Sequence, residues 1–190
     1  GMIKLYGEKI APKHPSQSIE RQIALVPEDR KDVGLFLRQS VRSNISVTML
    51  NKIQKLGFVK EKDEIKLARN YVSKLSIKTP SIEQKVQFLS GGNQQRVVIS
   101  KWLATNPQIL IIDEPTRGID VGAKVEIHKL IDQLASEGMA ILVISSELPE
   151  IISLSDRIGV MAQGEICAIL SGDEISEENI IRCATGQKLA

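Results

Sequence analysis

The sequence predicts an α/β fold: a parallel sheet with a helical subdomain and small antiparallel hairpins. Two observations carry this prediction. Aliphatic runs at Gln108–Pro115 and Ala140–Glu147 alternate with helical segments in the second half of the chain, an order typical of parallel sheets. From about Ser40 to Thr79 only helical spacing is found, which predicts an inserted or appended helical lobe.

The N-terminal part is predicted to form a hairpin arm and one buried strand. Residues Ile3–Ile10 alternate polar and apolar side chains around Gly7, which is a hairpin pattern. The run Ile23–Arg30 begins apolar and is stopped by Pro27, as expected of a buried strand that leads into a polar loop. In the helical stretch that follows, apolar residues recur every three or four positions and mark one helix face: Ile65, Ala68, Val72 and Leu75.

The middle of the chain reads as helix, strand and helix. A helix is predicted over Asn93–Thr105, after a glycine pair and before Pro107. The continuous aliphatic run Gln108–Pro115 is typical of a strand buried on both faces. A helix over Val121–Glu137 then ends at Gly138, a suitable C-terminal stop.

The last part is predicted to alternate short elements. Ala140–Glu147 is a second fully buried strand by the same reasoning, and Glu147–Leu154 is a short helix. A strand over Asp156–Ala162 turns at Gln163–Glu165 into a hairpin partner. The tail from Gly172 is expected to form a loop and a small helix.

Composition excludes several classes of function. The formal net charge of the 190 residues is +2, which gives no electrostatic argument for nucleic acid or a membrane surface. Aromatic residues make up 3%, too few for a base-stacking platform. The cysteines, Cys167 and Cys183, have neither metal-type nor redox-type spacing. No apolar run approaches the roughly 18 residues of a transmembrane helix.

Asp113 and Glu114 end the first aliphatic run, where open α/β sheets bind ligands. In phosphoryl-transfer sites an Asp in this place holds Mg²⁺, usually through water. The neighbouring carboxylate of Glu114 is placed to orient or deprotonate an attacking water. The alternative is an acidic cap of the strand at a turn, and the pair alone does not decide between the two.

The segment Leu89–Arg96, LSGGNQQR, is a second candidate site. Two glycines let the backbone approach a ligand closely, and Ser90 adds a hydroxyl. The helix that starts near Asn93 presents free N–H groups and a positive dipole end, which suits a triphosphate. The alternative is a flexible turn that caps a helix whose Gln94, Gln95 and Arg96 lie on the surface.

Taken in order, Leu-Ser-Gly-Gly, a helix, an Asn-Pro break, Asp-Glu-Pro-Thr and a Gly-x-Asp turn resemble the ATP-binding cassette (ABC) family, a branch of the P-loop NTPases. The resemblance implies that Glu114 is the catalytic carboxylate, Asp113 the Mg²⁺-site aspartate and Thr116–Asp120 a dimer-contacting loop. It also implies that the Leu-Ser-Gly-Gly segment reaches the γ-phosphate of ATP held by the opposite nucleotide-binding domain. The cofactor-contacting residues implied for this segment are Ser90, Gly91, Gly92, Asn93 and Gln94.

A closer resemblance is to the C-terminal half of the two-cassette ATPases that energise pentose and galactoside importers. The segments that carry it are ALVPEDRK, LSGGNQQ, DEPTRGIDVGAK and ISSELPEI. Where most cassettes have a glutamine that senses Mg²⁺ and the γ-phosphate, this chain has Glu28, and where most have a switch histidine it has Ser146. Both residues resemble what this importer half usually shows at these positions. They bear on whether an ATP site that is completed by this half hydrolyses ATP. His14 and His128 lie elsewhere in the pattern and are expected to be surface or structural residues.

The phosphate-cradling pattern G-x-x-x-x-G-K-[ST] does not occur in the sequence. Relative to the family, the chain begins downstream of that loop, so we expect an incomplete cassette that lacks the Walker A region. ATP and Mg²⁺ are then expected only with the missing region or a partner cassette, and ATP hydrolysis by this chain alone is not expected. The family's sheet has the missing strand between those at Ala140–Glu147 and Asp156–Ala162. These two strands are therefore expected to close up, or a second copy to fill the gap in a strand-swapped homodimer.

The function implied by the resemblance is that of a partial nucleotide-binding domain of a sugar-import ATPase, inactive alone. Its partners would be a second ABC nucleotide-binding domain and transmembrane permease subunits, not nucleic acid, and its place the cytoplasmic face of the cell membrane. The alternatives are a non-catalytic interaction module that docks on permease or cassette partners, and a cassette of the DNA-repair type. The near-neutral charge disfavours the latter. Three parts are expected: residues 1–33 and 89–190 in the ATPase core, and 34–88 in the helical subdomain.

Overall fold

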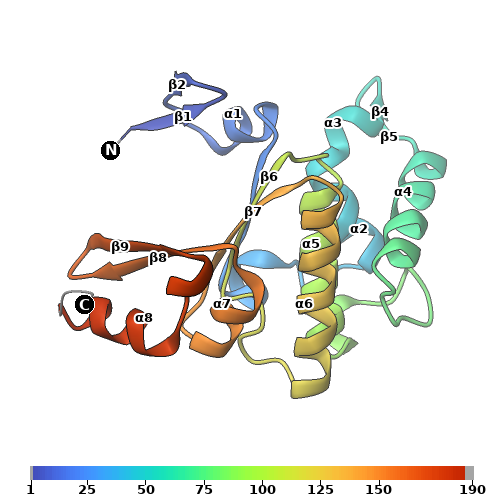
Figure 1. Cartoon of the computed structure of the whole chain (residues 1–190). Coiled ribbons are helices and arrows are strands. Elements are labelled where there is room, and N and C mark those ends of the chain that lie inside the picture. Colours follow the sequence, from blue (N-terminus) through green and yellow to red (C-terminus); the bar gives the residue numbers. More distant parts are fainter. Residues whose placement is uncertain (1, 187–190) are drawn as a thin grey trace. The chain divides into compact units, whose positions relative to one another are not determined.

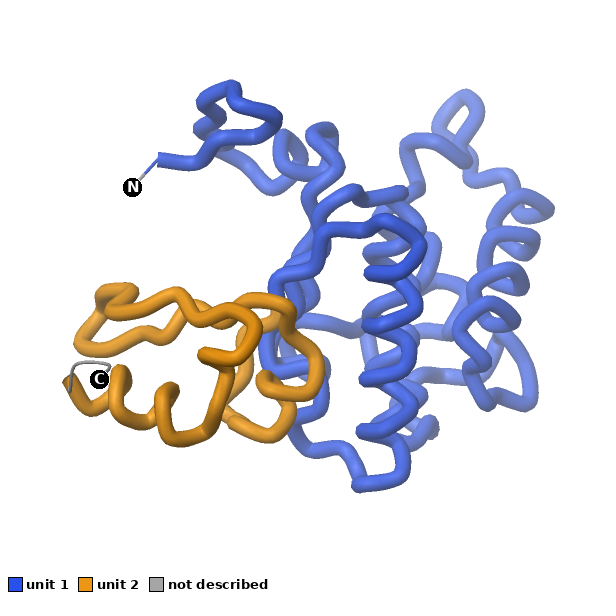
Figure 2. The backbone as a smooth tube through the Cα atoms, viewed as in Figure 1, with its two compact units in different colours: residues 1–142 blue, residues 143–190 orange. Residues whose placement is uncertain are grey.

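The computed structural model describes residues 2–186 and confirms the α/β class (Figure 1). The chain divides into two compact units, residues 1–142 and 143–190 (Figure 2). The division into three parts at 33/34 and 88/89 stays a prediction, and its outermost residues, 1 and 187–190, lie outside the described range. None of the described helices is both long and apolar enough to cross a membrane.

The N-terminal arm is an antiparallel hairpin, as predicted. Strand β1 (Ile3–Leu5) pairs with β2 (Glu8–Ile10). Tyr6 and Gly7 between them both have positive φ, 50° and 83°, which matches the right-handed twist of a two-residue hairpin turn. A short helix, α1 (Pro15–Glu20), then leads to the sheet.

The sheet of the first unit has the strand order β3–β6–β7. Strand β3 (Ile23–Val26) runs parallel to β6 (Ile109–Asp113) and confirms the predicted parallel sheet. Strand β7 (Ala140–Ile144) is less buried than the aliphatic run predicts. Leu142 is 54% and Ile144 46% exposed, so the prediction of a fully buried strand is wrong for β7. The exposed positions alternate along the strand: Ala140, Leu142 and Ile144.

The helical region contains an element that the sequence pattern does not show. The bounds are α2 (Val41–Ser46), a 3₁₀ turn η2 (Val47–Met49), α3 (Leu50–Ile53), β4 (Gln54–Lys55), β5 (Phe58–Val59) and α4 (Glu61–Lys74). The prediction of helix alone is therefore wrong at the hairpin β4–β5. Leu56 and Gly57, with φ of 53° and 83°, form a two-residue turn that a helix does not accommodate. The predicted face of α4 is confirmed, because Ala68 and Leu75 are buried.

Helix α5 (Gly91–Leu103) is the centre of the first unit. It follows a 3₁₀ turn, η3 (Val86–Phe88), and packs on β3, α2, α4 and α6. It begins at Gly91, two residues before the predicted start, because Ser90 already has the extended backbone of a cap residue. Helix α6 (Val121–Ser136) is capped by Asp120, whose carboxylate accepts a hydrogen bond from the Ala123 N–H at 2.9 Å.

The second unit has a hairpin and two helices around its own core. Its elements are α7 (Leu148–Leu154), β8 (Arg157–Ala162), β9 (Glu165–Ser171), the 3₁₀ turn η4 (Gly172–Glu174) and α8 (Glu177–Ala184). The hairpin β8–β9 and the terminal helix confirm the predictions for this part. The core side chains are Ile158, Val160, Leu170, Ile180 and Cys183. In the described sheets β8 pairs with β9 and β7 with β6, so the expected pairing of β7 with β8 is not found.

Candidate functional site

The loop after β3 is held by a carboxylate cap. It continues into a π-helical turn, η1 (Arg30–Gly34), a rare form that often occurs at functional sites. The Asp29 carboxylate accepts hydrogen bonds from the N–H groups of Lys31 at 2.8 Å and Asp32 at 3.0 Å. These backbone bonds lower the pKa of Asp29. Glu28, which follows the end of β3 by two residues, therefore lies immediately before a turn that is fixed by its cap.

The loop after β6 begins with an unusual backbone conformation. Asp113 is the last residue of β6, and Glu114 has a φ of 47°, in the left-handed region that side chains other than glycine rarely adopt. Tight turns follow, with the Arg117 N–H 3.3 Å from the Glu114 carbonyl oxygen and the Ile119 N–H 3.2 Å from that of Thr116. Such strain persists only where the surroundings impose it, and it clusters at functional sites.

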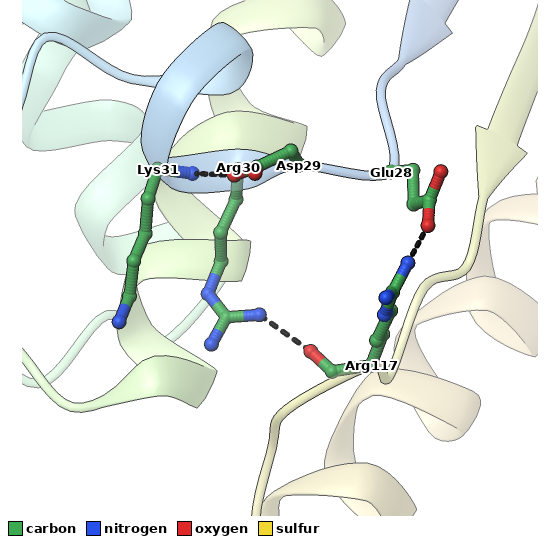
Figure 3. Close-up of a pocket in the computed structure, with 5 residues that line it drawn as sticks. All are labelled: Glu28, Asp29, Arg30, Lys31 and Arg117. Carbon is green, nitrogen blue, oxygen red and sulfur yellow. Dashed lines mark hydrogen bonds and ion pairs between the residues drawn. The ribbon is translucent and has the colours of Figure 1, made fainter.

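These two loops meet at a pocket of about 300 Å³ lined by Glu28, Asp29, Arg30, Lys31 and Arg117. Figure 3 shows the Glu28 carboxylate directed at the Arg117 guanidinium, with which it forms an ion pair. Sequence reasoning singled out Glu28 and placed Arg117 within the expected dimer-contacting loop Thr116–Asp120, but it did not pair the two residues. No spacing rule links a residue after one strand to a residue after another, so the pairing becomes visible only when the sheet places both strand ends together.

The first turn of α5 has its own set of contacts. The Ser90 hydroxyl accepts a hydrogen bond from the Asn93 side-chain amide at 2.8 Å, and the Asn93 side-chain oxygen accepts one from the Lys78 N–H at 2.8 Å. Gln94 is buried, and its side-chain amide donates to the Val86 carbonyl at 3.2 Å. Ser90 is thus exposed at the start of the helix, whereas Gln94 packs inward.

The glycine pair has a packing reason. A Cβ added to Gly92 would lie 2.7 Å from the Ala123 Cβ, and one added to Gly91 would lie 3.1 Å from an Arg30 guanidinium nitrogen. The absence of side chains therefore lets α5 approach α6 and the η1 turn. The sequence analysis explained the pair by close approach to a ligand; in the structure the missing side chains also allow close contacts within the protein.

A second pocket, of about 310 Å³, lies at the start of α5 and α6. Its charged lining residues are Lys78, Arg96, Asp120 and Glu126. Arg96 donates to the Ser76 carbonyl at 2.8 Å and pairs with Glu126, and Asp120 caps α6. Ser90, Gly92 and Asn93 line the same pocket, so the Leu-Ser-Gly-Gly segment faces a polar, mixed-charge space.

The predicted Mg²⁺ and ATP contacts fit the local chemistry. Within residues 2–186 the half-buried Asp113 carboxylate takes part in no hydrogen bond or ion pair, and no three His, Cys, Asp or Glu side chains gather as a metal site. A single available carboxylate suits Mg²⁺, which keeps several of its waters. The first-turn N–H groups of α5 have no intrahelical acceptor and suit an anion. Ser146 is exposed two residues after the end of β7 and belongs to the second unit.

Comparison with known proteins gives concordant results. The chain is 47% identical over 186 residues to the ribose import ATP-binding protein of Geobacillus kaustophilus, which covers 98% of this chain and 38% of the relative. It is 50% identical over 188 residues to the xylose import ATP-binding protein of Moorella thermoacetica, covering 99% of this chain and 37% of the relative. The chain thus spans little more than a third of the length of the curated relatives it matches.

The fold is also that of solved cassettes. A nucleotide-free ATP-binding cassette from an ABC transporter superposes with a TM-score of 0.76 at 22% identity, over 92% of this chain and 70% of that chain. The family model for the ABC transporter matches residues 1–117, more than half of the sequence. The chain belongs to the ABC transporter family.

Proposed function

We propose that this chain is the C-terminal part of a sugar-import ATPase and that its Ser90–Gly92 turn contacts the triphosphate of ATP held by a partner cassette. The observation that carries the proposal is the first turn of α5. Ser90 is exposed at its cap, and the backbone N–H groups beyond it point out of the helix without intrahelical acceptors. The curated relatives that match the chain over nearly its whole length are named as ribose and xylose import ATP-binding proteins.

In this proposal Glu114 and Asp113 serve a different ATP, one held by the same cassette. Glu114 acts as the general base that orients or deprotonates the attacking water, and Asp113 holds hydrated Mg²⁺. The metal, when bound, would neutralise charge on the phosphates. The contacts of Gln94 described above favour Ser90, Gly91, Gly92 and Asn93 over Gln94 as nucleotide contacts.

Glu28 and Ser146 occupy the positions of the sensing glutamine and the switch histidine. The ion pair of Glu28 with Arg117 ties the first of these positions to the loop that carries Glu114. Ser146, a hydroxyl with no charge near neutral pH, would contact phosphate only by hydrogen bonding.

The proposed partners are a second cassette and the transmembrane subunits of a permease, at the inner face of the membrane. One similar solved structure is described as a dimeric ATP-binding cassette bound to ADP and Pi. The helical subdomain at residues 34–88 and the Glu28 loop would face the permease. A strand-swapped homodimer is proposed for the separate chain, because β7 ends the described strand order and can accept a further strand.

The test is a graft. Residues of this chain replace the matched 186-residue segment of the Geobacillus kaustophilus ribose import protein, and ATP turnover is measured. We expect Ser90→Ala to lower turnover about tenfold or more, because a charge-assisted hydrogen bond to phosphate is lost. The matched control is Ser73→Ala, on the exposed surface of α4. Glu114→Gln is expected to abolish turnover at the site that Glu114 completes, a loss of about 10²-fold or more there.

The 190-residue chain by itself, without the graft, provides the complementary measurement. Without a supplied phosphate loop it is expected to show no ATP turnover above background. Equal turnover in the Ser90→Ala and Ser73→Ala grafts, with equal thermal melting, would remove the proposal. Turnover by the separate chain that Glu114→Gln abolishes would remove the claim that it is inactive alone.

A further inference from the structure

Arg30 reaches from the η1 turn to the backbone of the loop after β6. Its two terminal nitrogens donate to the carbonyl oxygens of Arg117 at 2.6 Å and Gly118 at 2.9 Å. Figure 3 shows this guanidinium directed at the main chain of Arg117, while the Arg117 side chain turns away towards Glu28. Arg30 therefore binds the main chain of this loop and not a neighbouring side chain.

Two glycines make the space that the guanidinium fills. A Cβ on Gly91 would lie 3.1 Å from the Arg30 Nη2 and 3.3 Å from the Gly118 carbonyl oxygen. A Cβ on Gly118, whose φ is 65°, would lie 3.6 Å from the same nitrogen. The Arg30 side chain thus lies beside both the first residue of α5 and the loop after β6.

The contact requires an arginine. A planar guanidinium presents paired N–H donors in a fixed fork, whereas a lysine ammonium is a single point of charge on a flexible stem. The side chain is half-buried, and its Nε is buried without a hydrogen-bond partner among the described groups. Burial lowers the pKa of Arg30, but an arginine keeps its charge near neutral pH. Its hydrogen-bonding capacity is directed at the two carbonyls.

We propose that Arg30 is a positioning residue that fixes the loop Glu114–Asp120 against the Ser90–Gly92 turn. The inference rests on the proposed function, in which these two segments contribute to nucleotide sites. The loop carries Glu114 at one end and the cap of α6 at the other, so a shift of Arg117 and Gly118 moves both. Without Arg30 the two segments keep their residues but lose their fixed spacing.

The first test is amide hydrogen exchange in the full 190-residue chain, without nucleotide. The variants are Arg30→Lys and Arg30→Met, with Arg38→Met in an exposed turn as the matched control. We expect both Arg30 variants to raise the exchange of the Arg117 and Ile119 amides about tenfold. The Leu75 amide, bonded to the Tyr71 carbonyl at 3.0 Å, reports the rest of the unit and should not change. Should Arg30→Met unfold the chain, Arg30→Lys, which keeps the charge, gives the result.

Unchanged loop exchange in Arg30→Lys, or an equal increase in Arg38→Met, overturns the proposal. The second test uses the graft described above and separates kcat from KM. Arg30→Lys is expected to lower kcat about tenfold and to leave KM for ATP within about twofold. Faster loop exchange with unchanged kcat would also overturn the positioning role. If instead Ser90→Ala leaves turnover unchanged while Arg30→Lys loosens the loop and lowers kcat, the proposed role of Ser90 falls and that of Arg30 stands.

Discussion

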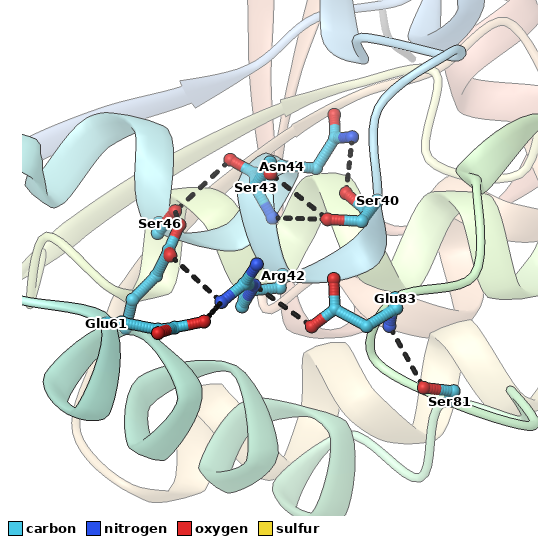
Figure 4. Close-up of polar contacts among 9 residues, drawn as sticks. Ser40, Arg42, Ser43, Asn44, Ser46, Glu61, Ser81 and Glu83 are labelled. Carbon is cyan, nitrogen blue, oxygen red and sulfur yellow. Dashed lines mark hydrogen bonds and ion pairs between the residues drawn. The ribbon is translucent and has the colours of Figure 1, made fainter. Parts of the chain in front are cut away.

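Two regions of the first unit each contain a half-buried arginine: the helical region, residues 34–88, and the strand-end region, which comprises the loops after β3 and β6 and the first turn of α5. The two arginines bind different kinds of group. Arg42 in α2 pairs with three carboxylates, those of Glu61 at 3.2 Å, Glu64 at 3.5 Å and Glu83 at 3.1 Å. Figure 4 shows it between α4 and the segment that precedes η3. Among the described residues, the side chain of Arg30 in the strand-end region bonds only to backbone carbonyls.

The difference lies in what each region can tolerate. In the helical region the partners are side chains, and Glu64 also accepts a hydrogen bond from the Ser46 hydroxyl at 2.6 Å, so the loss of one member leaves others in place. In the strand-end region the partners are backbone carbonyls, and their positions depend on glycines and on residues with positive φ angles. Substitutions should therefore act gradually in the helical region and sharply in the strand-end region.

The largest effect is expected at Gly92. In Gly92→Ala the new Cβ would lie 2.7 Å from the Ala123 Cβ, so α5 and α6 must separate. Overpacking of this kind costs about 1–3 kcal/mol, and the better helix propensity of alanine returns up to about 1 kcal/mol. We expect a net loss of about 1–2 kcal/mol in the free energy of unfolding, measured by urea denaturation.

Gly122→Ala is the matched control. Gly122 lies in the first turn of α6 and is exposed, and its added Cβ would meet only the Asp120 carboxylate, at an ordinary 3.6 Å. This change should stabilise the protein by about 0.4–1 kcal/mol, because it restricts the unfolded chain. Equal effects of the two substitutions would show that the contact between α5 and α6 is not tight.

A smaller effect is expected at Arg42. Arg42→Met leaves the Glu64 carboxylate, which is 14% exposed, with the Ser46 hydroxyl but without its cation. The expected loss is about 1 kcal/mol in low salt, and it should shrink as salt screens the exposed Glu61. Urea denaturation at low and high salt measures it, with Arg69→Met on the exposed side of α4 as the control. A loss as large as that of Gly92→Ala would contradict the gradual behaviour proposed for this region.

A substitution at Arg117 distinguishes the contribution of its side chain from that of its backbone carbonyl. In Arg117→Ala the exposed ion pair with Glu28 disappears, but the carbonyl that Arg30 contacts remains. We expect a change below about 0.5 kcal/mol in the free energy of unfolding, and no rise in the exchange of the Ile119 amide. Loosening of the loop as large as in Arg30→Lys would mean that the side chain of Arg117, and not its backbone, holds the loop.

Local patterns predicted the regular elements well. Strand β6, helix α6 and the hairpin β8–β9 follow from apolar runs, periodicity and a glycine turn within a few residues. The hairpin β4–β5 was missed because its strands have two residues each, too short for an alternating pattern. The exposure of Leu142 and Ile144 was missed because an aliphatic run records what a strand can bury, not what covers it.

The candidate site was predictable only in its separate pieces. Asp113, Glu114 and Ser90 stand in recognisable segments. The partners of Arg30 are carbonyls 87 and 88 residues away, and no side-chain pattern marks a carbonyl. The packing role of Gly92 likewise depends on Ala123 in another helix. Such contacts are properties of the assembled sheet and helices.

The smallest effect concerns Lys101, a buried lysine of α5 that joins this helix to the strand-end region. Its ammonium donates to the Gly34 carbonyl in the η1 turn, and burial lowers its pKa. Between the lowered pKa of the folded state and the ordinary lysine value of about 10.4, the unfolded chain binds the proton and the folded chain does not. Stability is therefore lost as the pH falls through this window. Stability should therefore rise with pH within this window, and Lys101→Met should remove the rise.

Urea denaturation of the wild type, Lys101→Met and the exposed control Lys129→Met, at a series of pH values from neutral to alkaline, measures this slope. Tyr71 acts with the opposite sign. Burial raises its pKa, so the unfolded chain loses that proton first and stability falls at the alkaline end. All three proteins keep Tyr71, so its contribution cancels in the difference between them. An identical slope in wild type and Lys101→Met would show that the buried ammonium has the same pKa in the folded and the unfolded chain, and that the contact between α5 and η1 carries no cost of burying the charge.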